Sequence, residues 1–290
     1  MEDSKKVHLP SIKEVLTDGC KFVINRIDLA AWFLLTSLVG MFAFGITFLP
    51  LIFVWLMPGW FITTVMLLGV MLGLSIFILS GTALTYAVYK SEKSGKCTFK
   101  EGLVWALQNF WPIVWLGTLA TLVVMTGFMF LLVPGLVVGV LTSFYVLVYM
   151  DEGHKGISAL VRSTEVVLRR PWAYIGKMIG IWLPLVLILS IWTWLVEELY
   201  KTFEYIGGLV EGVLTVLVGA VDVVIQMGVS VFAVYVLVVF YRAMSRGAED
   251  YSEKSRPKVR VAYKALAVIG CLTLFAGSFF TGFILGNPMN

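Results

Sequence analysis

Long stretches without charge alternate with short charged segments along this chain. No Asp, Glu, Lys or Arg occurs between Asp28 and Lys90, between Glu101 and Asp151, or beyond Lys264. A membrane-spanning helix needs about 20 mostly apolar residues, so each of the first two stretches has room for two spans. The pattern predicts seven spans, near residues 29–49, 60–89, 111–132, 135–150, 173–196, 213–241 and 265–286.

Glycine and proline pairs mark the expected turns between spans. Pro58-Gly59 and Pro134-Gly135 lie near the middle of the two longest uncharged stretches. Proline lacks a backbone N–H and glycine tolerates turn conformations, so each pair predicts the tip of a hairpin. Residues 207–215 (G-G-L-V-E-G-V-L-T) repeat the pattern of residues 134–142 (P-G-L-V-V-G-V-L-T), which predicts a third tip.

Three amphipathic segments precede the first, third and fifth spans, at residues 11–26, 98–110 and 156–170. Their apolar residues recur at spacings of three and four, which places them on one helical face. We expect each segment to lie as a helix at the cytoplasmic membrane surface. The alternative is a short solvated helix at the end of a loop.

These patterns predict an all-α, polytopic transmembrane helical bundle. Its repeating unit is an interfacial helix, a span, a turn and a span, used three times, so that six spans form three hairpin repeats with a seventh C-terminal span outside them. The expected division is residues 1–28 (cytoplasmic N-terminus with an amphipathic helix), 29–246 (six-span membrane domain), 247–264 (cytoplasmic linker) and 265–290 (seventh span and C-terminus).

The distribution of positive charge orients these spans. With the N-terminus in the cytoplasm, all 22 Lys and Arg residues except Lys201 fall on the cytoplasmic side. Cytoplasmic loops of membrane proteins carry an excess of Lys and Arg. We therefore expect a multi-pass protein of a bacterial or archaeal plasma (inner) membrane, with a cytoplasmic N-terminus.

Composition supports a membrane protein and excludes several other classes. Hydrophobic residues make up 59% of the chain and charged residues 14%, with a mean hydropathy of +0.92. Soluble domains have about 45–50% apolar and about 25% charged residues. An ordinary soluble enzyme and a disordered chain are thus excluded. The net charge of +4 is explained by topology, so no nucleic-acid partner is expected.

The stretch from residue 132 to residue 178 carries a resemblance to a known family. It contains Pro134-Gly135, an acidic pair before glycine at Asp151-Glu152-Gly153, and Ala159-Leu160 followed by Ser163. These motifs resemble the membrane domain found beside some glycerophosphoryl diester phosphodiesterases and in the related YciC-like proteins. The resemblance implies a six-span bacterial or archaeal membrane protein. The phosphodiesterase chemistry of that family belongs to a separate soluble domain, for which this chain has no room.

Motifs for catalysis or cofactor binding are not visible in the sequence. The two histidines are His8 and His154, and Asp151-Glu152-x-His154 is only a weak metal-binding pattern. No Gly-rich phosphate loop followed by Lys-Ser/Thr occurs. We therefore expect no catalytic residues, no metal and no cofactor, and the protein is not expected to be an enzyme.

Asp222 is the one acidic residue that can fall inside the bilayer. Gln226 and Ser230 follow at one and two helical turns, and the three form a polar stripe. Ionisable residues within a membrane usually mark a pathway or a proton relay, so the three are candidate pathway residues. The alternative, which we favour from the sequence, is that residues 223–241 suffice for the span and leave Asp222 at the outer interface.

A basic cluster flanks the cytoplasmic ends of the fourth and fifth spans. Arg162, Arg169, Arg170 and Lys177 are candidate ligands for a lipid headgroup, because guanidinium and ammonium groups bind phosphate. The structural alternative, which we favour, is that these bases pair with nearby acids and fix the helix at residues 156–170. The two interpretations are compatible.

Together these observations predict a non-catalytic integral membrane protein that acts as a lipid-embedded accessory or scaffold. Its expected partners are membrane lipids, with other membrane proteins or self-association as further possibilities. The alternative is a transporter of a small molecule, ion or lipid with Asp222 and Gln226 in the pathway. An intramembrane enzyme ranks last, because no nucleophile–base pair or metal set is visible.

Overall fold

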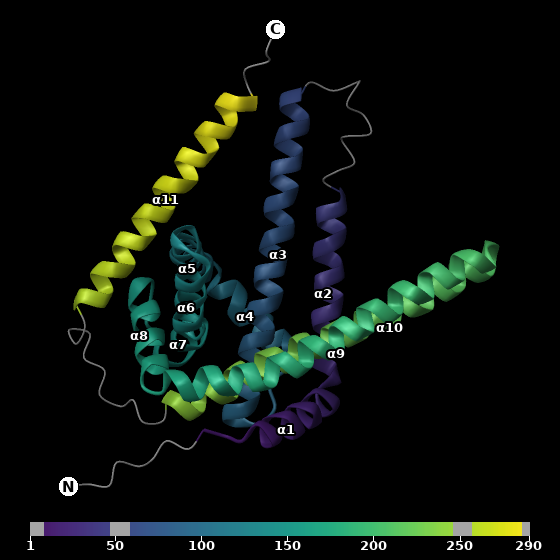
Figure 1. The fold of residues 1–290 in the computed structure, drawn as a ribbon, viewed down its shortest axis with the longest axis horizontal. Coiled ribbons are helices and arrows are strands. Elements are labelled where there is room, and N and C mark those ends of the chain that lie inside the picture. Colours follow the sequence, from purple (N-terminus) through teal and green to yellow (C-terminus); the bar gives the residue numbers. More distant parts are fainter. Residues whose placement is uncertain (1–8, 47–58, 246–256, 286–290) are drawn as a thin grey trace. The chain divides into compact units, whose positions relative to one another are not determined.

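The computed structural model describes residues 9–46, 59–245 and 257–285, and within them all regular secondary structure is α-helical (Figure 1). The helices are α1 (Ile12–Asn25), α2 (Ile27–Ile46), α3 (Gly59–Ser94), α4 (Phe99–Gln108), α5 (Phe110–Phe130), α6 (Leu132–Thr142), α7 (Tyr145–Glu152), α8 (Ile157–Leu168), α9 (Pro171–Ile206), α10 (Gly208–Ser245) and α11 (Pro257–Leu285). The all-α expectation is confirmed.

The helices are divided between two compact units. The first unit comprises Met1–Leu9, Asn109–Ile175 and Phe240–Asn290, and the second comprises Pro10–Gln108 and Gly176–Val239. Two of their boundaries fall inside α9 and α10, and the other two lie before α1 and directly after α4. The domain division expected from the sequence stays a prediction.

The first unit is built around contacts of α5, α6, α8 and α11. Its buried core contains Leu119, Ala120, Val123, Leu160, Val161, Tyr263 and Ala267. Close backbone packing holds α11 against α5, since a Cβ atom added at Gly270 would lie 2.7 Å from the main-chain oxygen of Leu122. The hydroxyl of Thr126 also donates to the main-chain oxygen of Leu266 at 3.0 Å. Helix α11, which contains the predicted seventh span outside the repeat, therefore contributes to this core.

Helix α8 is buried on almost every side within the first unit. Residues 159–164, 166 and 167 are all buried, including Arg162, Ser163 and Thr164. The hydroxyl of Ser163 donates to the main-chain oxygen of Leu141, and that of Thr164 is hydrogen-bonded to Tyr263. The helix is present where the sequence predicts it, but its polar residues have partners inside the unit. Its expected place at the cytoplasmic membrane surface stays a prediction.

The second unit contains the α2–α3 pair with α4 packed on α3. Helix α4 approaches α3 so closely that a Cβ atom added at Gly102 would clash with the main-chain oxygen of Ala83. The guanidinium of Arg26 joins the start of α2 to the end of α3, donating to Ser91 Oγ at 2.7 Å and to the main-chain oxygen of Cys97. Gly102 thus allows the close packing of α4 on α3, and Arg26 links the start of α2 to the end of α3.

Helix α1 packs on α9 and α10 in the second unit. It begins with a capping box, in which Glu14 N donates to Ser11 Oγ and Ser11 N donates to Glu14 Oε2. Gly19 lies against Phe232, and the Phe22 ring stacks on Tyr235 with centroids 4.8 Å apart. The predicted apolar face of α1 therefore meets other helices. All three predicted short segments form helices, namely α1, α4 and α8.

Two of the three predicted hairpin tips can be compared with the structure. Gly207 separates α9 from α10 at the predicted place, and it and Gly208, the first residue of α10, have φ of 68° and 69°. The prediction of a tip at Pro134-Gly135 is wrong, because the break lies at Leu131 and both residues belong to α6. Proline is tolerated in the first helical turn, where its missing N–H needs no partner. Pro58 lies outside the described residues.

Length and apolarity identify five described helical segments that can cross a membrane: Leu68–Ser94, Phe110–Phe130, Leu132–Glu152, Pro171–Tyr205 and Val210–Ser245. A sixth results if α1 and the described part of α2, bent by 70° at their junction, count as one. The predicted span 29–49 extends into residues that are not described, and the predicted span 265–286 falls largely within α11. The seventh span and the threefold repeat stay predictions.

Candidate functional site

Asp222 lies on α10 at the centre of a small hydrogen-bonded group. Its Oδ1 accepts from the indole Nε1 of Trp192 on α9 at 2.9 Å, and its Oδ2 accepts from Gln226 Nε2 at 2.8 Å. The hydroxyl of Ser230 donates to the main-chain oxygen of Gln226 at 2.9 Å. The predicted polar stripe is therefore partly connected: Gln226 contacts the carboxylate, whereas Ser230 contacts only the backbone.

Trp192 is the member of this group that sequence reasoning missed. The signal was present, because Trp192 and Asp222 lie equal numbers of residues before and after Gly207. In an antiparallel hairpin whose turn is at Gly207, such positions lie at the same level along the two helices. An indole N–H is a donor only, so it pairs readily with a carboxylate at that level.

The surroundings of Asp222 supply neutral donors and no countercharge. In the part of the chain that the structure describes, no Lys, Arg or His side chain pairs with Asp222. Asp222 is half-buried and Gln226 is exposed. The group thus holds a carboxylate that is hydrogen-bonded and open on one side.

Arg162 forms the opposite kind of group in the first unit. Its Nε donates to Glu152 Oε2 at 2.7 Å, and its Nη1 lies 3.6 Å from Glu165 Oε2. His154 Nε2 lies 3.4 Å from the same Glu152 oxygen, and Tyr241 Oη lies 3.3 Å from Glu152 Oε1. Only 4% of Arg162 is exposed, and its guanidinium is engaged by two carboxylates of its own chain.

The other candidate headgroup ligands occupy different positions. Arg169 and Arg170 are exposed at the end of α8, whereas Lys177 donates to the main-chain oxygen of Pro10. Arg162, the buried member, is held by the ion pairs that the structural alternative expects. Arg169 and Arg170 are the two members with exposed side chains. The headgroup role stays a prediction for them.

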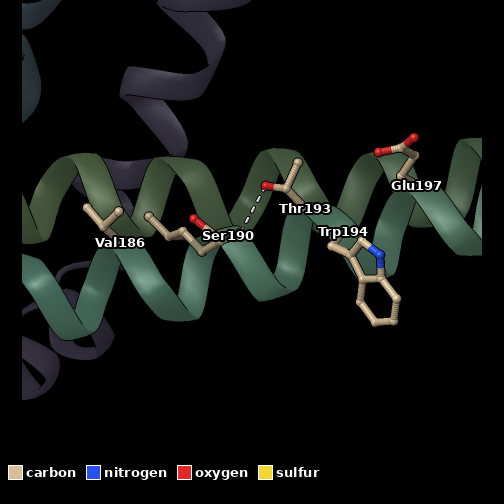
Figure 2. A pocket seen from close by; sticks show the side chains of 6 residues that line it. Val186, Ser190, Thr193, Trp194 and Glu197 are labelled. Carbon is tan, nitrogen blue, oxygen red and sulfur yellow. Dashed lines mark hydrogen bonds between the residues drawn. The ribbon is translucent and has the colours of Figure 1, made fainter.

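An open groove runs along one face of α9, away from Trp192. Figure 2 shows that its side chains all come from this single helix. They are Val186, Leu189, Ser190, Thr193, Trp194 and Glu197. The hydroxyl of Thr193 is used within the helix, donating to the main-chain oxygen of Leu189 at 2.9 Å. The groove is therefore mainly apolar.

A third ionisable group lies between α3 and α4, outside the membrane-crossing segments. The thiol of Cys97 is buried and donates to Glu101 Oε2 at 3.5 Å. Burial, followed by this hydrogen bond, raises the pKa of Cys97 to about 11. Hydrogen bonds from Thr98, Lys90 and Cys97 lower the pKa of Glu101. Cys97 is therefore a neutral thiol near neutral pH and a poor nucleophile.

Comparison with known proteins gives no relative for this chain. No family model, curated protein or solved structure matches it. The resemblance of residues 132–178 to the YciC-like membrane domain stays a prediction. Within the described residues, no three His, Cys, Asp or Glu side chains are arranged to hold a metal ion.

Proposed function

We propose that this chain is a non-catalytic accessory or scaffold protein of a bacterial or archaeal plasma membrane. Its several long apolar helices suggest a membrane location. The more specific role is supported by how its ionisable groups are used: Arg162 is engaged by Glu152 and Glu165, and Arg26 by Asp28 and backbone oxygen. These groups join helices to one another.

The observation that carries the proposal is the uncovered surface of α9. Only 11% of the most apolar 18-residue segment of α9 is buried, against 39% of the corresponding segment of α5. Its exposed large apolar side chains include Ile179, Leu183, Leu187, Ile188 and Ile191. A surface of this kind contacts lipid or another membrane protein, and transmembrane helices associate through such lateral packing. An accessory protein needs a lateral surface of this kind.

The test is photocrosslinking in native lipid discs. A photoreactive residue placed at Leu187, on the exposed face of α9, should give one reproducible protein adduct that is identified by mass spectrometry. The same probe at Val231, which is buried, serves as the control and should give none. Adducts with lipid alone at Leu187 would contradict the accessory role.

A transporter is the second candidate, and the Asp222 group favours it. A carboxylate with neutral donors on a long apolar helix is the kind of residue that binds substrate or ions in membrane transporters. Comparing co-purified molecules for the wild type and Asp222→Asn separates the two candidates. A protein partner retained in Asp222→Asn supports the accessory role, and a small molecule or lipid lost in the variant supports transport.

A further inference from the structure

We infer that the face of α10 that carries Gln226 binds a second copy of this chain, with the two Gln226 carboxamides hydrogen-bonded to one another across a two-fold axis. The inference rests on the unused hydrogen-bonding groups of Gln226, on its exposure among apolar side chains and on its place in a long apolar helix. It goes beyond the accessory role, which names no partner, and does not depend on it.

The first step is the hydrogen bonding of Gln226. A carboxamide has two N–H donors and an oxygen that accepts. One N–H of Gln226 donates to Asp222 Oδ2 at 2.8 Å. Within the part of the chain that the structure describes, the second N–H and the Oε1 atom of Gln226 have no hydrogen-bond partner. The bond to Asp222 orients the amide, which thus presents one donor and one acceptor side by side.

The second step is the apolar surface around this amide. Gln226 is exposed, and the large side chains exposed nearby on α10 are apolar, among them Leu217, Val221 and Val224. Residues Val210–Ser245 are long and apolar enough to cross a membrane. Crossing takes about 20 residues, and every part of that length within this segment contains Gln226. Hydrocarbon supplies no hydrogen bonds, so an unpaired amide there is costly.

The third step is the identity of the partner. The unused donor and acceptor belong to one group, so the same group on a second copy satisfies both through two reciprocal N–H···O bonds. A two-fold axis along the membrane normal brings equivalent residues together in this way. An ammonium group only donates and a carboxylate only accepts, so a charged side chain of another protein would leave one of the two unpaired. Polar side chains join transmembrane helices by such bonds.

The same face of α10 leaves room for a second helix. Gly212 and Thr215, about four and three turns before Gln226, lie on this face and are exposed. A Cβ atom added at Gly212 would meet no atom within 4 Å. Small residues allow transmembrane helices to approach closely. The carboxylate of Asp222 is directed to α9, where Trp192 donates to it, so it lies beside the amide pair.

The experiment is a dilution series of the purified full chain in lipid vesicles, with one dye on an added tag and the dimer fraction counted from photobleaching steps. We expect the wild type to change from dimer to monomer as the protein-to-lipid ratio falls. Gln226→Leu removes the amide and should weaken association about five- to tenfold, because hydrogen bonds between transmembrane helices are individually modest. Gln226→Asn keeps a carboxamide and should retain more of the affinity. Leu217→Ala, on the opposite face of α10, is the control and should leave the affinity unchanged.

Disulfide formation identifies the face that pairs. In a chain whose three native cysteines are changed to alanine, Ser230→Cys places a thiol one turn from Gln226 on the same face. Val224→Cys places an exposed thiol on the opposite side of α10 at a similar level. On oxidation in the vesicles, Ser230→Cys should form several-fold more disulfide-linked dimer than Val224→Cys.

Three results would overturn the inference. They are a wild type that stays monomeric at every protein-to-lipid ratio, an affinity that Gln226→Leu does not change, and equal disulfide formation at positions 230 and 224. The dilution series uses the native cysteines, so it stands even if the cysteine-free chain fails to fold. Both assays contain this chain alone, so their failure is distinct from a failure of the accessory role, which the adduct at Leu187 tests.

Discussion

The Arg162 group and the Asp222 group each contain an ionisable side chain, but its charge has different partners in the two groups. Arg162 is buried in the first unit and meets two carboxylates, Glu152 and Glu165, so opposite charges compensate one another. Asp222, in the second unit, receives only neutral N–H donors from the described residues. Ion pairing between elements makes the first group a means of holding helices together. The uncompensated charge of the second makes it a candidate site.

The largest effect is expected from Arg162→Ala. Removing this guanidinium takes away the cation that Glu152 and Glu165 share, and breaking a buried pair in this way costs about 3–5 kcal/mol. The midpoint of thermal unfolding in detergent should therefore fall strongly. Arg169→Ala, which alters the exposed arginine directly after the same helix, is the control and should cost less than about 1 kcal/mol. Equal effects of the two variants would remove the contrast between the groups.

Gly19→Ala should destabilise the second unit without changing the hydrogen-bonded group around Asp222. The added Cβ would lie 2.5 Å from Phe232 Cε2, so α1 or the ring must move, at a cost of about 1–3 kcal/mol. Gly176→Ala is the matched control, because no atom lies within 4 Å of a Cβ there. Alanine in that helical position should stabilise by about 0.5–1 kcal/mol. If both variants shift the midpoint of thermal unfolding in the same direction, α1 does not pack as described.

Trp192→Phe should have a smaller effect on stability. It keeps one aromatic ring but removes the pyrrole part of the indole with the N–H that donates to Asp222, and loss of a hydrogen bond to a charged group costs about 1.5 kcal/mol. Trp194→Phe changes a neighbouring tryptophan on the groove face and should leave the thermal midpoint nearly unchanged. If Trp194→Phe costs as much as Trp192→Phe, the hydrogen bond contributes nothing specific.

The effect that is smallest near neutral pH is a dependence on alkaline pH at Cys97, the third ionisable group. Folding raises the pKa of this thiol from its ordinary 9.0 to about 11, so the folded state favours the neutral form. The associated stability is complete below pH 9.0 and is lost as the pH rises to about 11. Wild type should therefore lose stability relative to Cys97→Ala only over this interval. Cys20→Ala, at an exposed position, should not change the pH profile.

Local sequence patterns predicted where the helices form better than they predicted what each helix packs against. The segments at residues 11–26, 98–110 and 156–170 form α1, α4 and α8, because apolar spacing and capping act over a few residues. The turn at Gly207 was also predictable, since two consecutive glycines readily adopt positive φ. The turn near Pro134 was not, because proline fits equally well into the first turn of α6.

The candidate site was predictable on one helix only. A spacing of four residues brings Asp222 and Gln226 together on α10, as the sequence indicates. Trp192 comes from α9, and its contact depends on the register of the hairpin. The burial of Arg162 likewise depends on how α7 and α8 pack, because the same amphipathic pattern can face water or protein.

The sequence by itself determined that this chain is helical and apolar enough for a membrane, because composition and charge spacing are properties of the chain alone. It also determined which residues carry ionisable groups within or beside apolar stretches. Only the tertiary structure decided that Arg162 has two carboxylate partners while Asp222 has neutral donors and, within the described residues, no partner of opposite charge. The physical reason is that compensation of a charge depends on which helices pack together, and segments distant along the chain supply those partners.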